Sequence, residues 1–336
     1  MIFKRVIYLG YYFKELDWSK LNKFLSYVKD KYNISKLKLW NDIIYSTFKY
    51  NISIMDYFFF KFYEMTSIER KKYAGTGYMY EYQLLMNPKE NRHVLENKIM
   101  FNNKYAKFIT HKSATKSDFF TDNTKAQALL HNKSGRLILK SSDGQCGEGV
   151  VLVDLNKVKE NEVIERLKNT QNDLIEEFII QHDDLMKLSP SGLNTVRIFT
   201  QLDKNDNVVI LGARLRITID SYIDNLAAGN IAASINVEGG IVDGHGVYSD
   251  ITKNEEEFHP LTNMKIKGFK IPYWDESLKM VKEAALWQKD NRSIGWDVAI
   301  TNEGPELLEG NHNWCKLLWQ LPVKKGLKKE LEVYLK

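Results

Sequence analysis

Hydrophobic and polar positions in the first part of the chain alternate with the period of an α-helix. Two sets of apolar residues show this spacing: Leu21, Phe24, Leu25 and Val28, and then Trp40, Ile43, Ile44 and Phe48. Thr66 is followed by Glu69 three residues later, which is the pattern of a capping box at the start of a helix. We therefore predict a helical region over residues 1–92.

This helical region is rich in aromatic and lysine residues. The run from Tyr57 to Tyr63 is aromatic at every position except Lys61. One interpretation is a helical cap that packs on the main domain. The alternative is a surface for a lipid-linked or polysaccharide-making partner, because aromatic and basic side chains together suit a membrane interface.

From about residue 135 the pattern changes to short apolar runs of strand length. The predicted strands are Leu137–Lys140, Val150–Val153, Leu174–Ile180, Thr195–Thr200, Val208–Asp220, Ser293–Ile300 and Glu306–Asn311, with a helix at Ser277–Lys289. Strands and helices do not alternate regularly, as they would in a doubly wound fold. The sequence therefore predicts an α+β fold with a largely antiparallel sheet.

Composition narrows the class of protein without naming a function. The chain of 336 residues is 43% hydrophobic and 27% charged, which is typical of a globular protein. A net charge of +5 with no concentrated basic stripe argues against a nucleic-acid partner. Cys146 and Cys315 form no disulfide framework, and no apolar run is long enough to cross a membrane. We expect a cytoplasmic protein that is not transmembrane, with peripheral membrane contact left open.

A predicted hairpin near the end of the chain carries acidic residues. Asp297 alternates with the apolar positions of the first strand, so it points away from their face. In the second strand, Glu309 and Asn311 share a face, and a hairpin centred on Glu303 places Asp297 directly opposite Glu309. Facing carboxylates repel unless a cation neutralises them, and two carboxylates with an amide oxygen suit Mg²⁺. The alternative is a hairpin whose acids face water.

A glycine-rich loop follows the first predicted strand of the α+β region. Lys140 ends that strand, and Gly144, Gly147 and Gly149 are spaced through the loop. Glycines let backbone N–H groups approach phosphate oxygens, and a lysine at the edge adds positive charge. The loop has neither the lysine of a P-loop nor a following helix. An ordinary long hairpin loop explains it equally well on its own, and the neighbouring Mg²⁺-type acids favour triphosphate binding.

The strand over Leu174–Ile180 could recognise a nucleotide base. Its backbone groups would contact adenine as an open strand edge through Glu176, Glu177, Phe178 and Ile179. Asp183 or Asp184, just beyond it, could bind a ribose. The alternative is a buried strand with two acids at its rim.

Three arginines occupy adjacent apolar strands. Arg197 lies in the middle of one, and Arg214 and Arg216 share the polar face of the next. Charged groups within apolar strands are seldom left unpaired, and arginine binds carboxylates and phosphates through two hydrogen bonds. We expect Arg197 and one or both of Arg214 and Arg216 to face a γ-phosphate, an acyl phosphate or a substrate carboxylate, and all three to act in catalysis if they line one cavity. The alternative pairs them with surface acids.

Taken together, these segments resemble the ATP-grasp superfamily, and most closely its sugar-transfer-associated branch from polysaccharide biosynthesis. The resemblance covers about residues 90–320, and its motifs in chain order are LENK, LILKSSDGQCGEGV, LIEEFIIQH, LNTVRIFT, DNLAAGN, IGWDVAIT and LLEGN. It implies ATP clasped between two α+β subdomains. The implied division is a helical region at 1–92, a lid subdomain at 93–182 and a core subdomain with the metal site at 183–336.

The resemblance also implies roles for particular residues. Lys98 and Lys140 would contact phosphates, with Lys104 as the alternative to Lys98. The segment from Glu176 to Ile179 would form the adenine hinge, and Arg197 would stabilise the transferring phosphoryl group. The Mg²⁺ ligands would be Asp297, Glu309 and Asn311.

The implied activity is a ligase that activates a carboxylate as an acyl phosphate and joins it to an amine, releasing ADP and phosphate. The partners are then a small-molecule carboxylate and a small-molecule amine of capsule or cell-surface polysaccharide synthesis, and one of them could be a sugar, a sugar nucleotide or an amino acid. Two alternatives stay open. One is a non-catalytic ATP-binding protein of a polysaccharide-assembly complex, and the other is a kinase that leaves the γ-phosphate on a hydroxyl.

Overall fold

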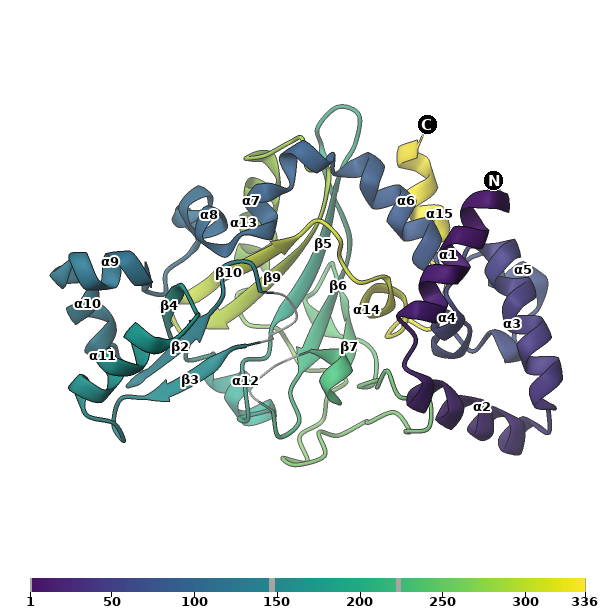
Figure 1. Cartoon of the computed structure of the whole chain (residues 1–336), viewed down its shortest axis with the longest axis horizontal. Helices are drawn as coiled ribbons and strands as arrows, with labels where there is room; N and C mark the ends of the chain where they lie inside the picture. The colour runs from purple at the N-terminus through teal and green to yellow at the C-terminus, as the bar shows by residue number, and fades with distance from the viewer. Residues whose placement is uncertain (1, 145–148, 222–224, 336) are drawn as a thin grey trace.

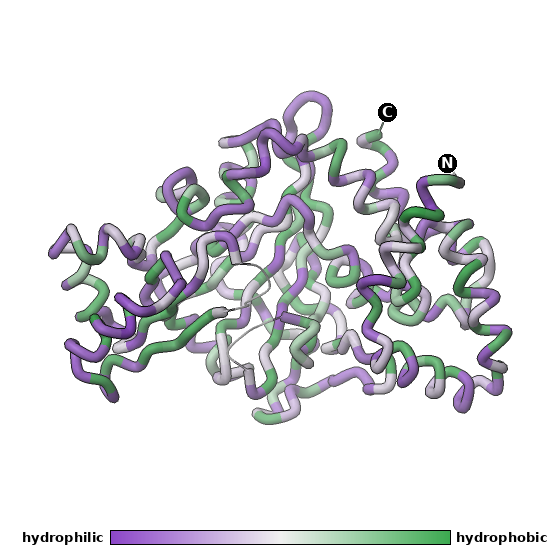
Figure 2. The backbone as a smooth tube through the Cα atoms, in the orientation of Figure 1, coloured by the Kyte–Doolittle hydropathy of each residue, from purple (hydrophilic) through white to green (hydrophobic). Residues whose placement is uncertain are grey.

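The computed structural model describes residues 2–144, 149–221 and 225–335, and the chain folds into three connected parts (Figure 1). The central part is a six-stranded antiparallel sheet in the order β10-β9-β5-β6-β7-β8. Its strands are β5 Val196–Leu202, β6 Val208–Ile217, β7 Ile231–Asn236, β8 Ile241–Val242, β9 Ser293–Thr301 and β10 Gly304–Asn311. Apolar residues run along much of these strands (Figure 2) and form one of the hydrophobic cores.

A smaller four-stranded sheet forms a lobe at one end of the molecule (Figure 1), in the order β1-β4-β2-β3. Its strands are β1 Ser113–Thr115, β2 Arg136–Lys140, β3 Val151–Asp154 and β4 Leu174–Glu177. Helices of the lobe are α9 Lys116–Thr121, α10 Asn123–Leu130 and α11 Glu160–Asn169. Leu137 and Leu139 alternate inward along β2 and pack with Val163 and Leu167 of α11, so the lobe has its own core.

The opposite end of the molecule is helical, and both the N-terminal and the C-terminal segments lie in it (Figure 1). Its helices are α1 Ile2–Lys14, α2 Trp18–Tyr32, α3 Lys36–Tyr50, α4 Ile54–Phe59, α5 Ser67–Arg70 and α6 Thr76–Met86, with α14 Lys316–Gln320 and α15 Lys328–Glu332 from the C-terminal segment. Gln320 donates to and accepts from the backbone of Ala74, and Lys316 lies 3.2 Å from the buried Asp56. The helical region therefore packs firmly on the C-terminal segment.

The remaining helices connect the parts or cover the large sheet. They are α7 His93–Glu96, α8 Lys98–Lys104, α12 Asp183–Leu188 and α13 Trp274–Leu286, with short 3-10 turns at Phe62–Glu64, Lys89–Asn91, Ala106–Phe108, Leu226–Ala228 and Val333–Leu335. Phe101 and Tyr105 of α8 contact Trp296 of β9, at ring-centroid distances of 6.5 Å and 5.4 Å. Helix α8 thus packs on the large sheet. The division at residues 92 and 182 stays a prediction.

Most of the local predictions agree with the structure. Helix α2 buries its four predicted apolar residues, and Thr66 with Glu69 forms the predicted capping box. The α+β fold with two largely antiparallel sheets and N-terminal helices is confirmed. No helix within the described residues is long and apolar enough to cross a membrane.

Some predicted boundaries were wrong. The strand expected to reach Ile180 ends at Glu177, and the one expected to reach Asp220 ends at Ile217. The helix expected from Ser277 begins at Trp274. Beyond Glu177 the apolar run over residues 178–180 continues after ladder pairing has stopped, and periodicity in general places an element more securely than its ends.

Candidate functional site

The predicted acidic hairpin forms from β9 and β10, and Asp297 pairs directly with Glu309. The pairing runs in step from Gly304↔Thr301 to Leu307↔Val298, and then the register shifts before Glu309. Leu308 is the extra residue of this β-bulge. The predicted opposition of the two carboxylates is confirmed, and the bulge is what produces it.

Asp297 is buried between two arginines of neighbouring strands. The Arg197 guanidinium donates to both carboxylate oxygens, with 2.8 Å between its Nη2 and Oδ2. Arg216 Nη2 lies 2.7 Å from the same Oδ2. Burial alone would raise the pKa of Asp297, but the two arginines outweigh burial and hold the pKa well below its usual range. Asp297 is therefore ionised at neutral pH.

Glu309 has the opposite electrostatic environment. Burial raises the pKa of Glu309, and the facing Asp297 raises it further, while Arg197 and Asn311 oppose the shift. Asn311 Nδ2 donates to Glu309 Oε1 at 3.1 Å. Arg197 and Asn311 offset only part of the repulsion between Asp297 and Glu309. A cation between the two carboxylates would remove the remaining repulsion, so its binding there would be favourable. Asp297, Glu309 and Asn311 are therefore the residues here that could hold a divalent ion.

The chemistry of this donor set fits Mg²⁺, which accepts few protein ligands when phosphate oxygens or waters complete its coordination. Asp297 would be shared with its arginines, since a carboxylate has about four lone-pair sites. No group of three or more His, Cys, Asp or Glu side chains suited to a metal occurs in residues 2–144, 149–221 and 225–335, and the hairpin set has only two carboxylates beside its amide.

Arg214 does not join the other two arginines, which corrects the expectation that all three line one cavity. It is buried, and its guanidinium donates to the carbonyl oxygen of Trp319, with 3.1 Å from Nε. A second hydrogen bond of 2.6 Å reaches the carbonyl of Ala213. Burial lowers the pKa of Arg214 to about 10. Arg214 therefore holds helix α14 against the large sheet. Strand periodicity could not predict this contact, because the carbonyl of Trp319 comes from a distant part of the chain.

Lys98 lies between the hairpin and the glycine-rich loop. It opens helix α8, and its ammonium group donates to the carbonyl oxygen of Gly144. Burial lowers the pKa of Lys98, the charge of Glu309 opposes this shift, and Lys140 adds to it. These groups are thus close enough to interact. Lys104, the alternative phosphate lysine, is exposed at the far end of the same helix.

The predicted glycines are only partly described. Gly149 has a φ of +70°, a conformation that favours glycine, and its carbonyl accepts from Asn172 at 3.0 Å. Gly144 donates its N–H to Ser141. Gly147 lies outside the described residues. The proposed role of the loop in phosphate binding stays a prediction.

A buried chain of charges joins the two sheets, and sequence reasoning missed it. Lys140 of β2 lies 2.5 Å from Glu176 of β4, and His111 Nε2 lies 3.7 Å from the same carboxylate. His111 Nδ1 lies 2.9 Å from Glu306 of β10, whose carboxylate also accepts from the backbone of Thr110. The chain Glu306–His111–Glu176–Lys140 thus connects the hairpin strand to the lysine of the small sheet.

Both acids of this chain are held ionised. Burial would raise the pKa of Glu176, but Lys140 and His111 outweigh it and lower the pKa well below its usual range. Burial would also raise the pKa of Glu306, but the hydrogen bond and charge of His111 outweigh burial and lower this pKa. Burial would lower the pKa of His111, yet the two acids raise it to about 9, so His111 is protonated at neutral pH. Nothing in the sequence marks His111, because both its partners are distant in the chain.

The expected open edge at the adenine strand is wrong for its first residues. Strand β4 lies inside the sheet, between β1 and β2, because β1 adds to its other side. Glu177 N–H donates to Lys112 O, and Phe178 N–H donates to Arg136 O. Ile179 comes after the last residue of the strand, and adenine binding by this segment stays a prediction. Asp184 is half-exposed and lies 2.9 Å from Lys187.

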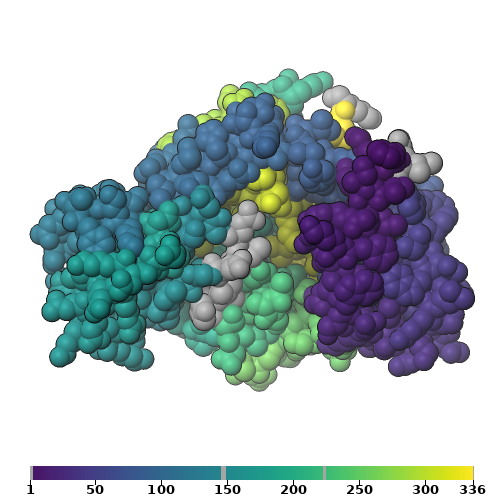
Figure 3. Space-filling view, in the orientation of Figure 1, coloured from purple at the N-terminus to yellow at the C-terminus, as the bar shows by residue number. Residues whose placement is uncertain are grey.

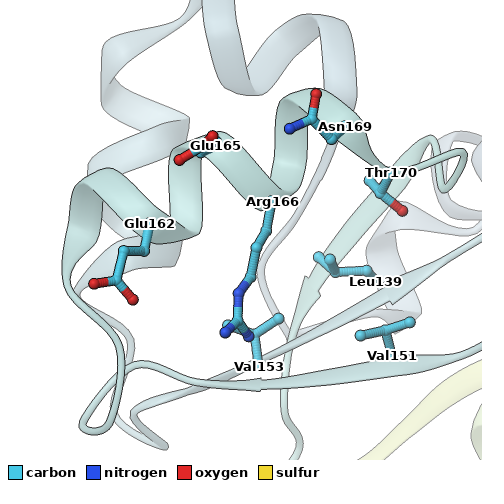
Figure 4. A pocket seen from close by; sticks show the side chains of 8 residues that line it. All are labelled: Leu139, Val151, Val153, Glu162, Glu165, Arg166, Asn169 and Thr170. Carbon is cyan, nitrogen blue, oxygen red and sulfur yellow. The ribbon is translucent and has the colours of Figure 1, made fainter.

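A separate hollow of about 490 Å³ lies between α11 and the strands β2 and β3 (Figure 4). Arg166 extends from the helix toward Val153 there. None of the predicted site residues lines this hollow, and we assign it no role.

One family model matches most of the chain. The sequence profile of the family described as sugar-transfer associated ATP-grasp matches residues 78–334. The match begins within α6, so helices α1 to α5 lie outside it. A search of curated proteins finds no match.

Similar solved structures include ATP-grasp ligases. The ligase PsnB with a minimal precursor has 13% identity and a TM-score of 0.44, over 74% of this chain and 63% of that one. The L-amino acid ligase from Bacillus licheniformis has 14% identity and a TM-score of 0.43, over 73% of this chain and 49% of that one. The ADP complex of N5-carboxyaminoimidazole ribonucleotide synthetase has 9% identity and a TM-score of 0.39. The match covers 65% of this chain and 45% of that one. This chain therefore spans less than two thirds of these proteins.

Proposed function

The chain belongs to the sugar-transfer associated ATP-grasp family, and on that premise we propose that it is an ATP-dependent carboxylate–amine ligase. It would hold Mg²⁺ and ATP between the small sheet and the acidic hairpin. The products would be an amide, ADP and phosphate. Its place would be the cytoplasmic side of cell-surface polysaccharide synthesis.

The observation that carries the proposal is the pairing of Asp297 and Glu309 beside Arg197 and Arg216. Both guanidinium groups pair with Asp297, so they lie directly beside the proposed cation site. Asp297, Glu309 and Asn311 would hold the cation, and Arg197 and Arg216 would offer their remaining N–H groups to phosphate oxygens. Such contacts are favourable because arginine binds phosphate through two hydrogen bonds.

Lys98 and Lys140 would neutralise the phosphates from the opposite side. Phosphoryl transfer depends mainly on positioning and on stabilising charge, so lysines, arginines and a metal suffice without a nucleophilic side chain. The substrate carboxylate attacks the γ-phosphorus, the bond to the bridging oxygen breaks, and ADP leaves. The amine then attacks the acyl carbon, phosphate leaves, and the amine loses a proton. The bound metal would screen charge on the phosphate oxygens.

The positive charge of Arg197 and Arg216 favours an anionic acid and its acyl phosphate over a protonated amine. We therefore expect the carboxylate to bind with or after ATP and the amine to enter last. The family description points to a sugar as one partner, such as a uronic acid or an amino sugar. An amino acid is the other candidate class.

The test is ADP release measured with paired panels of acids and amines. The acids should include uronic-acid sugars and amino acids, and the amines should include amino sugars. ADP formation that requires both an acid and an amine, together with free phosphate, supports the proposal. A stable phosphorylated product without free phosphate would identify a kinase. ATP binding without any ADP in all mixtures would identify a nucleotide-binding protein.

A further inference from the structure

Helix α1 lies on the surface of the helical region (Figure 3) and exposes several large apolar side chains. Phe3, Val6, Ile7 and Tyr11 are exposed to 77%, 51%, 56% and 59%, and we call these four residues the α1 patch. Their spacing of three and four residues places them in one stripe along the helix. Large apolar side chains gathered in this way usually mark an interaction surface.

The opposite face of α1 is already held by the protein. Tyr12 is buried in the helical core, and the Arg5 guanidinium donates to the carbonyl oxygen of Phe48. Tyr8 donates to Glu81 of α6 at 3.1 Å. Because the polar and apolar contacts of this face are satisfied, α1 cannot turn the α1 patch inward without losing them.

Charge indicates what covers the patch. Lys4 and Lys14 are exposed on the same helix, and residues 2–14 contain no acidic residue. The nearest acid along the sequence is Glu15, just beyond the end of the helix, and Glu81 of α6 contacts the opposite face of α1. Two copies of the chain meeting at this face would bring the lysines together without acidic partners from the helix. An anionic lipid surface supplies the matching charge and accepts the apolar side chains.

We propose that α1 binds the protein to the surface of an anionic membrane, with the α1 patch inserted at the level of the headgroups. This contact is independent of the ligase activity, since α1 lies outside the matched family range and outside the nucleotide site. Contacts between the helical region and the C-terminal segment, such as Lys316 with Asp56, would then hold the active site in a fixed orientation to the membrane.

The experiment is flotation of the full-length chain, without an N-terminal tag, with two kinds of vesicle. One kind is phosphatidylcholine alone, and the other is phosphatidylcholine mixed with phosphatidylglycerol. We expect binding to the anionic vesicles that weakens at high salt. The double variant Phe3→Ser/Ile7→Ser should bind about tenfold or more weakly, because two exposed apolar side chains no longer insert. Lys4→Gln should weaken binding about fivefold.

The matched control is Ile68→Ser, which removes an apolar residue exposed to 73% on α5. It should bind vesicles as the wild type does. Thermal stabilisation by nucleotide should be the same in wild type and in all these variants, because the α1 patch lies outside the nucleotide site. Vesicle binding is measured without nucleotide, so its result does not depend on the ligase proposal. The proposal is overturned if wild type ignores both vesicles, or if Phe3→Ser/Ile7→Ser binds normally. It is also overturned if sedimentation shows a dimer that this double variant dissociates, since a second copy then covers the patch.

Discussion

Asp297 and Glu309 face each other across β9 and β10 because Leu308 bulges from the second strand. If the pairing continued in step without this register shift, Leu308 would lie opposite Asp297, and Glu309 would pair with Trp296 instead. A bulge that brings two acids together in a buried hairpin adds repulsion to the fold. Bulges are frequent beside active sites, where they redirect a side chain. We interpret this one as a feature of the metal site.

The two acids should respond differently to neutralisation. Glu309→Gln removes repulsion from a group whose pKa is already raised, so it should abolish turnover while leaving the melting temperature unchanged or higher. Asp297→Asn removes the partner of Arg197 and Arg216 and should destabilise the fold by about 3–5 kcal/mol. Chemical denaturation and ADP release measure these effects.

The control for this pair is Glu303→Gln at the exposed tip of the same hairpin. It should leave both activity and stability within the range of wild type. Near-normal turnover by Glu309→Gln would refute the metal assignment.

The lysines of the small-sheet side should control nucleotide affinity. Lys98→Ala and Lys140→Ala each remove a positive charge beside the glycine-rich loop, and each should raise the KM for ATP about tenfold or more. Lys104→Ala, on the same helix as Lys98 but exposed, should leave the KM for ATP unchanged. Steady-state kinetics with varied ATP compares the three. A larger effect from Lys104→Ala would reverse the assignment.

Arg214 and Arg216 lie two residues apart and should give opposite phenotypes. Arg214→Ala loses its hydrogen bonds to Trp319 and should destabilise the protein by about 2–3 kcal/mol, with kcat/KM little changed at low temperature. Arg216→Ala should instead lower kcat/KM about tenfold or more, because it removes charge beside Asp297. Equal losses of kcat/KM in both variants would show that Arg214 acts on the substrate and not only in the packing of α14.

Stability should depend on pH through His111. Its pKa is raised from an ordinary value of 6.5 to about 9 in the folded protein. The resulting stabilisation is complete below pH 6.5 and is lost as the pH rises through about 9, and it amounts to about 3 kcal/mol. The charged groups that face His111 are Glu176 and Glu306, and Lys140 forms an ion pair with the other carboxylate oxygen of Glu176. Urea denaturation between pH 6 and 10 should show this decline.

His111→Gln keeps a hydrogen-bonding side chain without a titrating ring, so its decline over this range should be smaller than that of wild type. His131→Gln, at an exposed histidine, should behave as wild type. Identical pH profiles for wild type and His111→Gln would show that His111 is not charged in the folded state.

Local chemistry made much of the fold and part of the site predictable. Helical spacing identified the core of α2, and alternation in β9 separated Asp297 from the apolar face. The facing of Asp297 and Glu309 was predicted for an incomplete reason, since counting outward from Glu303 ignores that Thr301 pairs with Gly304. Two offsets cancelled, the shifted turn centre and the bulge.

The unpredicted features depend on contacts between distant segments. Arg214 meets a carbonyl that lies 105 residues further along the chain, and His111 meets an acid 195 residues away. Strand alternation gives the face of a side chain but not the partner that arrives from another element. Helix α11 is a different case, because Val163 and Leu167 have helical spacing and the signal was present but unused.

The central claim is that Asp297, Glu309 and Asn311 bind Mg²⁺ together with ATP. Its most direct test is calorimetric titration of ATP into the wild type and into Glu309→Gln, each with and without Mg²⁺. The account predicts that Mg²⁺ strengthens ATP binding to the wild type about tenfold or more and that Glu309→Gln loses this gain while remaining folded. Equal ATP affinity with and without Mg²⁺ in the wild type, or an undiminished gain in Glu309→Gln, would contradict it.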